Sequence, residues 1–369
     1  MTKYDYLVVG AGATGLCFVD VMLRYTNKTI LLVDKNHEPG GHWTDYYPYV
    51  KLHQNPSTYG IESIPLENDT GESIKEHFKK ALETFTKYPN FTYSFNTEID
   101  LSNIKIPHTT FVDARYLEVK RLKNKWNIPT PWNLKLINKP HIVIGGGKTG
   151  MDTCIWLIKH NIKVKWIVSH HAYWLIKEKI KNLGNIPNSI FLLKIKKFII
   201  NKLNPNFSLS FDNRFYSSSN NPTRYKCAIV NKEEYDIIKN IEIINNGYVT
   251  NKINNTLHFE NNESIDFGDV IFVNCIQNGC PIKNTVPIFQ KNKIILQPIV
   301  LCQSCFSATC IAKMEALNSK LDIIPIKYPK TPKEGVEGYS ESEINLAKLY
   351  NSNIKNEIFN SRLNQYIFK

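Results

Sequence analysis

The stretch YLVVGAGATG, residues 6–15, recurs in nearly the same pattern as HIVIGGGKTG, residues 141–150. Each is a short apolar run that ends in glycines at the positions G-x-G-x-x-G. The first glycine of this pattern permits a tight turn, the second lets backbone approach a pyrophosphate, and the third lets a helix pack closely on a strand. The repetition therefore predicts two strand-turn-helix units, each built to hold a dinucleotide at the start of its helix.

In the first unit, apolar runs at 6–9 and 30–33 predict two buried strands that flank a helix. The residues expected to cradle the phosphates are Gly10, Gly12, Ala13, Thr14 and Gly15. Asp34 ends the second strand, 24 residues after the first glycine, and Lys35 follows it. A carboxylate at this position accepts hydrogen bonds from ribose hydroxyls and repels a 2′-phosphate. We therefore expect Asp34 and Lys35 to flank the adenosine of FAD or NAD.

The second unit repeats the plan, with strands at 141–144 and 164–168 around a helix that extends to 159. Its cradle residues are Gly145, Gly147, Lys148, Thr149 and Gly150. A nucleoside-triphosphate loop is excluded, because it would need glycine where Ile142 stands. Ser169 replaces the acid, again 24 residues after the first glycine, and His170 follows. A 2′-phosphate would not be repelled there, although no arginine is at hand, so this site should bind NADPH in preference to NADH.

Two such sites of different preference predict a flavoprotein that a nicotinamide nucleotide reduces. The expected fold class is α/β, with two Rossmann-type domains, the NAD(P) domain being inserted in a split FAD domain. The FAD domain should comprise residues 1–135, with a helix at 73–86 and strands at 91–95 and 109–113, and residues 269–369. The NAD(P) domain should cover 139–268, with a helical insertion at 175–240 and a β-hairpin meander near its end. A further helix is expected near 341–365.

The segment EPGGHWTDYYPYVKLHQNPSTYGI, residues 38–61, lies between the two fingerprints. Its Gly-Gly-x-Trp and Tyr-Pro resemble the flavin-containing and Baeyer–Villiger monooxygenases. Together with VDARY (112–116) and FSATCIAKMEA (306–316), it is closer still to an uncharacterised bacterial-type group of FAD/NAD(P)-binding oxidoreductases. The resemblance covers the chain from 4 to about 317. One signature of the monooxygenases, Phe-x-Gly-x-x-x-His, is missing before Gly145, which leaves the oxygen-transfer step open.

The resemblance implies hydride transfer from NAD(P)H to FAD, followed by oxygen transfer to a small molecule. It places Gly41, His42 and Trp43 beside the flavin and its pyrophosphate. It also places the candidate catalytic residues His53, Gln54 and Asn55 along the isoalloxazine ring. In the flavin-containing monooxygenases an asparagine of this region supports the flavin during oxygen transfer, and Asn55 is its nearest match.

Two alternatives remain open at the level of sequence. Cys302 and Cys305 form a Cys-x-x-Cys, which would suit a flavin-dependent disulfide reductase, and an NAD(P)H:acceptor reductase is a related alternative. The other is a nucleotide-binding sensor without turnover. No second Cys-x-x-Cys exists, so a four-cysteine zinc site is excluded and no metal is expected, and the irregular spacing of the cysteines argues against a disulfide framework.

Composition restricts the partners. The net charge is +13, but the lysines are dispersed through the chain instead of forming one basic tract, so we expect no nucleic acid. The apolar runs are far shorter than the ~20 residues of a membrane span, so we expect no membrane and a cytoplasmic protein with a small-molecule substrate. The sequence makes no prediction of oligomeric state.

Overall fold

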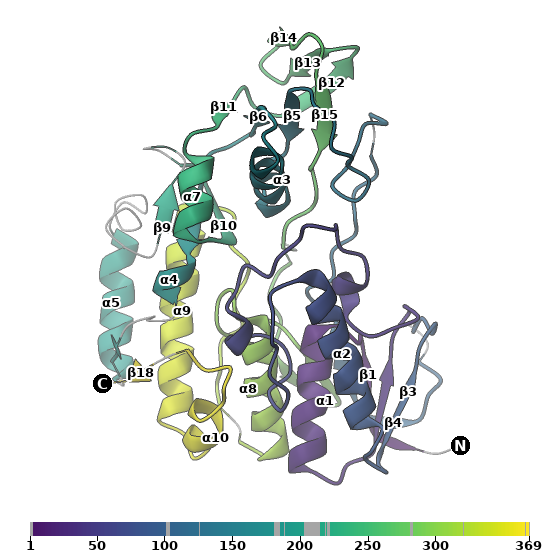
Figure 1. The fold of residues 1–369 in the computed structure, drawn as a ribbon. Helices are drawn as coiled ribbons and strands as arrows, with labels where there is room; N and C mark the ends of the chain where they lie inside the picture. The colour runs from purple at the N-terminus through teal and green to yellow at the C-terminus, as the bar shows by residue number, and fades with distance from the viewer. Residues whose placement is uncertain are drawn as a thin grey trace.

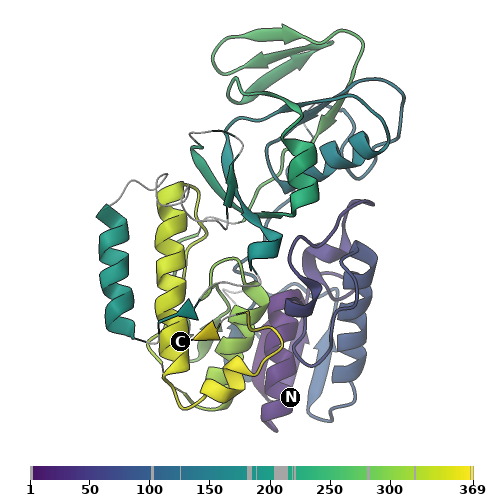
Figure 2. The same cartoon turned by 60° about the vertical axis from the view of Figure 1, so that its left-hand side comes forward.

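The computed structural model describes residues 3–100, 104–124, 126–180, 185–187, 189–202, 215–217, 219, 222–280, 283–319, 321–365 and 367–368. Two lobes are visible in Figures 1 and 2. One lobe contains both ends of the chain, and the other is built from the middle of the sequence. None of the helices in these described ranges is both long enough and apolar enough to cross a bilayer.

The first lobe is built on a sheet of spatial order β16-β17-β4-β1-β2-β3. Its strands are β1 (Tyr4–Val9), β2 (Ile30–Val33), β3 (Phe91–Ser94), β4 (His108–Asp113), β16 (Phe289–Gln290) and β17 (Lys293–Ile295). All neighbours pair in parallel except β16 and β17. Helices α1 (Ala13–Tyr25) and α8 (Ser304–Ala316) pack against each other, and α2 (Gly71–Phe85) packs on α1. The strands and helices predicted for residues 1–113 are confirmed to within a few residues.

The second lobe repeats this arrangement in a parallel sheet of order β11-β6-β5-β15. Its elements are β5 (His141–Ile144), α3 (Lys148–Lys159), β6 (Val164–Ile167), β11 (Glu242–Ile244) and β15 (Ile271–Asn274). They take the places of β1, α1, β2, β3 and β4 in the first sheet. The expected meander is present as the antiparallel strands β12 (Val249–Ile253), β13 (Thr256–Phe259) and β14 (Ser264–Asp266). Because β15 pairs with β5, the second sheet extends to Asn274, beyond the expected boundary at 268.

The insertion at 175–240 is not wholly helical, which corrects the expectation. Its described helices are α4 (Lys177–Ile180), α5 (Ile190–Lys202) and α7 (Lys232–Ile238). Its described strands are β8 (Asn185–Ile186), β9 (Phe215–Ser217) and β10 (Arg224–Val230), and β10 pairs in parallel with β7 (Ala172–Ile176). The run CAIV in β10 is buried or half-buried, so contacts with β7 favour a strand. Residues 181–184, 188, 203–214, 218 and 220–221 lie outside the described residues.

The C-terminal helix also differs from its expected bounds. Helix α9 (Pro332–Tyr350) begins nine residues before 341, and α10 (Lys355–Phe359) and β18 (Ile367–Phe368) follow. Thr331 caps α9 in a reciprocal hydrogen-bond pattern with Glu334, and Pro332 occupies the first turn. These are start signals that favour a helix here despite the two glycines within it.

Candidate functional site

In the first glycine turn, a side chain would fit at Gly12 but not at Gly15. A methyl group on Gly15 would stand 1.9 Å from the carbonyl oxygen of Gly10, so α1 starts tight against the end of β1. A methyl group on Gly12 would meet only the Cα of Gly41, at 3.7 Å. Gly12 is the N-cap of α1 and supplies no side chain to the first N–H groups of the helix. Gly12 and Gly41 therefore lie against each other, and the first N–H groups of α1 beside them have no capping side chain and can donate to a phosphate.

Asp34 is fixed beside this turn. Its carboxylate is buried and accepts hydrogen bonds from the backbone N–H of Ala11, at 2.6 Å, and of Asn36, at 2.8 Å. The remaining lone pairs can accept hydroxyl groups of a ribose. Lys35 forms an ion pair with Glu118, which raises the pKa of Lys35.

The other members of the first cradle belong to the start of α1 and the loop that follows β2. Ala13 is the first residue of α1, and the Thr14 hydroxyl donates to the Ala114 carbonyl at 3.3 Å. Trp43 is buried and its indole N–H donates to the hydroxyl of Tyr59 at 2.8 Å. The ring centroid of His42 lies 5.0 Å from that of Trp43, and the His42 side chain is exposed to solvent.

The three candidate catalytic residues have different surroundings. The Nδ1 atom of His53 is buried and has no hydrogen-bond partner among the described residues. Burial, together with the positive charges of Lys148 and Lys177, lowers the pKa of His53 to about 3, so its imidazole is neutral at physiological pH. The Gln54 amide donates to the Cys302 carbonyl.

Asn55 has a local role that the sequence did not predict. Its side-chain oxygen accepts the backbone N–H of Ser57 at 3.2 Å, which makes it the N-cap of the short helix η2 (Pro56–Thr58). Of the three residues, only His53 has a buried side-chain nitrogen without a hydrogen-bond partner in the described part of the chain, and a ligand or an ordered water could supply that partner.

The second glycine turn reproduces the first. A methyl group on Gly150 would stand 2.0 Å from the carbonyl oxygen of Gly145, whereas one on Gly147 would meet nothing within 4 Å. Gly147 is the N-cap of α3, again without a capping side chain. Thr149 lies in the first turn of α3, where its carbonyl accepts the hydroxyl of Thr153 at 2.7 Å. The open side of this turn is therefore suited to close approach of a phosphate.

Lys148 forms ion pairs with two carboxylates. Its amino group lies 2.8 Å from Asp152 and 3.1 Å from Glu234. Burial alone would lower the pKa of Lys148, but the two acids together raise it. The lysine therefore stays charged and paired, and its predicted contact with a nucleotide would require it to leave these partners.

Basic side chains lie where the second ribose is expected. His170 follows Ser169 after β6, and its Nε2 is 3.1 Å from a guanidinium nitrogen of Arg224, 54 residues further along the chain. Lys226 donates to the Gly146 carbonyl at 2.6 Å, and burial, with a contribution from Arg224, lowers the pKa of Lys226 to about 8. Arg224 and Lys226 were not among the residues predicted from the sequence, because they lie on β10, within the insertion that was expected to be helical. The apolar, β-branched end of RYKCAIV is the signal that could have revealed this strand.

The Tyr-Pro segment joins the two lobes. The hydroxyl of Tyr47 donates to Asp152 of α3 at 2.7 Å. The hydroxyl of Tyr49 lies 2.9 Å from that of Thr153, and its ring stacks on Trp156 with the ring centroids 4.5 Å apart. The chain that leaves the first glycine site therefore rests directly on the helix of the second.

The structure separates Cys302 and Cys305, which contradicts the dithiol interpretation. Cys302 forms a disulfide with Cys227 of β10, with the Cα atoms 5.7 Å apart. Cys305 is buried in α8 and faces Cys17 of α1, whose thiol lowers the pKa of Cys305 through a hydrogen bond. The turn at Cys302 points its sulfur toward β10, while Cys305 lies within the helix and points toward α1. The bridge between Cys227 and Cys302 was not predicted from the sequence, which argued only against a disulfide framework.

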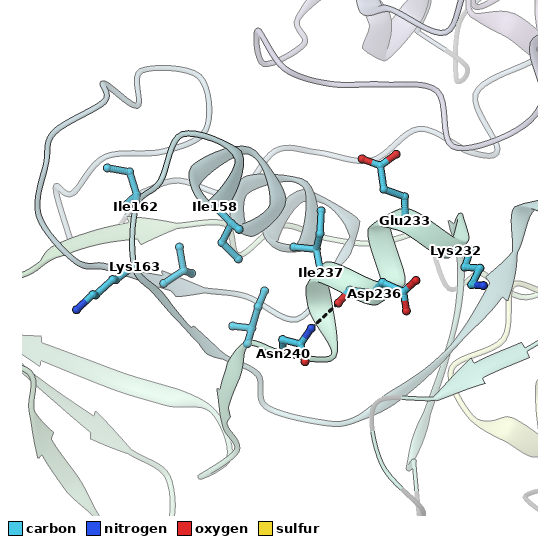
Figure 3. Close-up of a pocket in the computed structure, with 10 residues that line it drawn as sticks. Ile158, Ile162, Lys163, Lys232, Glu233, Asp236, Ile237 and Asn240 are labelled. Carbon is cyan, nitrogen blue, oxygen red and sulfur yellow. Dashed lines mark hydrogen bonds between the residues drawn. The ribbon is translucent and has the colours of Figure 1, made fainter.

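A groove of about 820 Å³ on the second lobe lies away from these residues (Figure 3). It runs between the C-terminal part of α3, with Ile158, the loop that follows it, with Ile162, and α7, with Ile237. The Asn240 amide donates to the Asp236 carbonyl at its edge. Because the glycine turn lies at the opposite end of α3, this groove is not the nucleotide site.

Comparison with known proteins supports the repeated dinucleotide fold. Residues 8–73 match the model of the NAD(P)-binding Rossmann-like domain. Uncharacterized protein Rv2000 of Mycobacterium tuberculosis is 26% identical, over 84% of this chain and 67% of that protein. A double mutant of a flavin monooxygenase from Stenotrophomonas maltophilia superposes with a TM-score of 0.52 at 10% identity, covering 86% of this chain and 98% of the other.

The closed structure of cyclohexanone monooxygenase gives a TM-score of 0.53 at 14% identity, covering 86% of this chain and 85% of that one. The chain has the fold of the flavin monooxygenases. The α/β class with two Rossmann-type units, predicted from the paired glycine motifs, is therefore confirmed.

Proposed function

We propose that this protein is an oxidoreductase that binds FAD at the first glycine turn and NADPH at the second, and that it transfers oxygen to a small molecule. The observation that carries the proposal is the pair of open positions, Gly12 and Gly147, each at the N-terminus of a helix that its own lobe presents. Two such cradles in one chain need two dinucleotides. The likeness in fold to flavin monooxygenases supports this choice of chemistry.

The residues of the first lobe fit FAD. Gly12, Ala13 and Thr14 would bind the pyrophosphate with backbone N–H groups, and Asp34 would accept the ribose hydroxyls. The unpartnered Nδ1 of His53 would gain a hydrogen-bond partner on the ring system. When bound, FAD would supply hydride acceptance and reaction with oxygen.

The residues of the second lobe favour NADPH over NADH. Arg224, His170 and Lys226 lie together at the end of the second sheet, where a 2′-phosphate would be placed. The planar guanidinium of Arg224 can bind the 2′-phosphate of NADPH with two hydrogen bonds. The 2′-hydroxyl of NADH carries no charge and would form a weaker contact. This arrangement provides the arginine that is absent from the immediate sequence around Ser169.

The side chains near the expected flavin ring would position and shield it. His53 is neutral, so it can give or accept one hydrogen bond without contributing charge. Gln54 ties this segment to the turn before α8 through the Cys302 carbonyl. Tyr47 and Tyr49 hold α3 over the same segment, which would keep the nicotinamide close and water out.

We further propose that the two sheets are the cores of two domains. The FAD domain would comprise 1–135 together with the chain after β15, and the NAD(P) domain would begin at 139 and end at Asn274, with the insertion at 175–240. Pairing of β17 with β4 supports the return of the chain to the first domain.

The proposal is tested by the spectrum of the purified protein. We expect a yellow protein whose flavin absorbance is bleached by NADPH without oxygen, and at lower concentration than by NADH. Readmission of air should give a transient spectrum before that of oxidised flavin returns. Immediate return would favour a reductase, bleaching by neither nucleotide would favour a sensor, and a protein that takes up no FAD would overturn the proposal.

A further inference from the structure

A second cavity, of about 300 Å³, adjoins the segment that contains the candidate catalytic residues. Gln54 and Asn55 form one wall, and Gln303, the residue before α8, forms another. Lys177 of α4 and Ile229 of β10 close the cavity from the insertion. The chain near the C-terminus completes the lining. The cavity thus lies where four distant parts of the sequence meet beside the expected flavin edge.

The lining is rich in amides and hydroxyls. Besides Gln54, Asn55 and Gln303, it contains the amide side chains of two residues near the C-terminus and the hydroxyls of η2. Gln303 is buried, with 5% of its surface exposed. Its side-chain oxygen accepts a hydrogen bond from the side-chain amide of Gln365 at 3.1 Å. No hydrogen bond donated by its amide nitrogen is found within the described residues, so this group can donate to a ligand in the cavity.

Lys177 supplies the one charged side chain of this lining within the described residues. Its nearest described carboxylate is Asp69, at 3.9 Å, too far for a hydrogen bond. The lysine therefore has donors to spare. Its charge also lowers the pKa of His53, which indicates that the cation lies close to the expected flavin edge.

We propose that this cavity is the substrate site and that it takes a small polar anion, a carboxylate that also carries hydrogen-bonding groups. Lys177 binds the carboxylate, and Gln303 with the neighbouring amides binds the polar remainder. An apolar ketone would leave the charge of Lys177 and the amide nitrogen of Gln303 without a ligand partner. The inference rests on the proposed function, because it makes the cavity the place where the substrate meets the flavin.

The Cys227–Cys302 disulfide supports a preformed site. Cys227 lies two residues before Ile229, and Cys302 directly precedes Gln303. The bridge therefore ties together the two walls that these residues form. A tied cavity keeps its shape in the absence of ligand, which lowers the entropic cost of binding.

Binding can be measured without turnover, by calorimetry on the FAD-loaded protein without NADPH. The probes are 4-amino-4-oxobutanoate and butanediamide, which share a primary amide and differ in charge, the first being a carboxylate and the second its amide. We expect the carboxylate to bind at least tenfold more tightly than the amide, since hydrogen bonds to charged groups are the stronger ones. Lys177→Gln should abolish this difference, and Lys177→Arg should retain it.

The matched control is Lys51→Gln. Lys51 also lies 3.9 Å from Asp69 but does not line the cavity, so the control should keep the full preference. Equal binding of the two probes, no binding of either at millimolar concentration, or an unchanged preference in a folded Lys177→Gln would each overturn the inference. NADPH bleaching, measured separately, decides the proposed function. A charge preference without bleaching would leave the site standing and remove the activity.

Discussion

Replacing Gly147 by alanine should change nucleotide binding at the second glycine turn without changing the conformation of the turn. Gly147 has φ −99° and ψ −179°, an extended conformation that alanine adopts freely. The added methyl group would meet no protein atom within 4 Å. A loss of nucleotide binding in this variant must therefore come from contact between the methyl group and the ligand.

The expected change in stability is small. Loss of glycine reduces the entropy of the unfolded chain, which stabilises by about 0.4–1 kcal/mol. Alanine is a poorer N-cap than glycine by about 0.5–1 kcal/mol. The two effects nearly cancel, so the free energy of unfolding should stay within about 1 kcal/mol of that of the unmodified protein.

The expected change in binding is large. The methyl group would occupy the position from which a phosphate oxygen approaches the start of α3 at about 2.9 Å. Loss of one hydrogen bond to a charged group costs about 1.5–3 kcal/mol. This corresponds to a Kd for NADPH that is roughly 10–150-fold higher.

The assay is an NADPH titration followed by tryptophan fluorescence or calorimetry, with urea unfolding measured in parallel. Gly150→Ala is the contrasting variant, because its methyl group would stand 2.0 Å from the Gly145 carbonyl oxygen and should cost about 3 kcal/mol of stability. Gly12→Ala should lower FAD content and leave NADPH affinity unchanged. A folded Gly147→Ala that binds NADPH with unchanged Kd would refute the placement of the nucleotide against this turn.

Three further predictions follow from individual side-chain contacts. With a pKa of about 8, Lys226 is charged below that pH, so NADPH affinity should fall as the pH rises from 7.5 to 9, and Lys226→Met should flatten this profile. Cys227→Ser opens a bridge that spans 75 residues to Cys302 and should lower the free energy of unfolding by about 2–4 kcal/mol in urea, whereas an unchanged midpoint would show that the bridge does not form. Tyr47→Phe removes a 2.7 Å hydrogen bond to Asp152 and should cost about 1–3 kcal/mol, measured by thermal unfolding, with FAD content preserved.

The strand-turn-helix units were predictable because their causes are local. Gly15 and Gly150 face carbonyl oxygens only five residues earlier in the sequence, and the apolar runs of β1 and β5 are contiguous. The position of Asp34 beside the first glycine turn was predictable for the same reason, because Asp34 directly follows the short apolar strand β2. The insertion was harder to predict, because the β-branched residues at the end of β10 are a weak local sign of a strand, and its pairing with β7 is not local.

The sequence by itself determined that the chain contains two dinucleotide turns, and that an acid follows the first but not the second. These features depend on steric limits and hydrogen bonds within a few residues. Only the tertiary structure decided that Arg224 joins His170 across 54 residues, that Cys302 pairs with Cys227 instead of Cys305, and that Lys177 closes a cavity beside Gln54. The physical reason is that pairing of β10 with β7, and packing of α8 against α1, set which distant side chains meet, and no local spacing records that outcome.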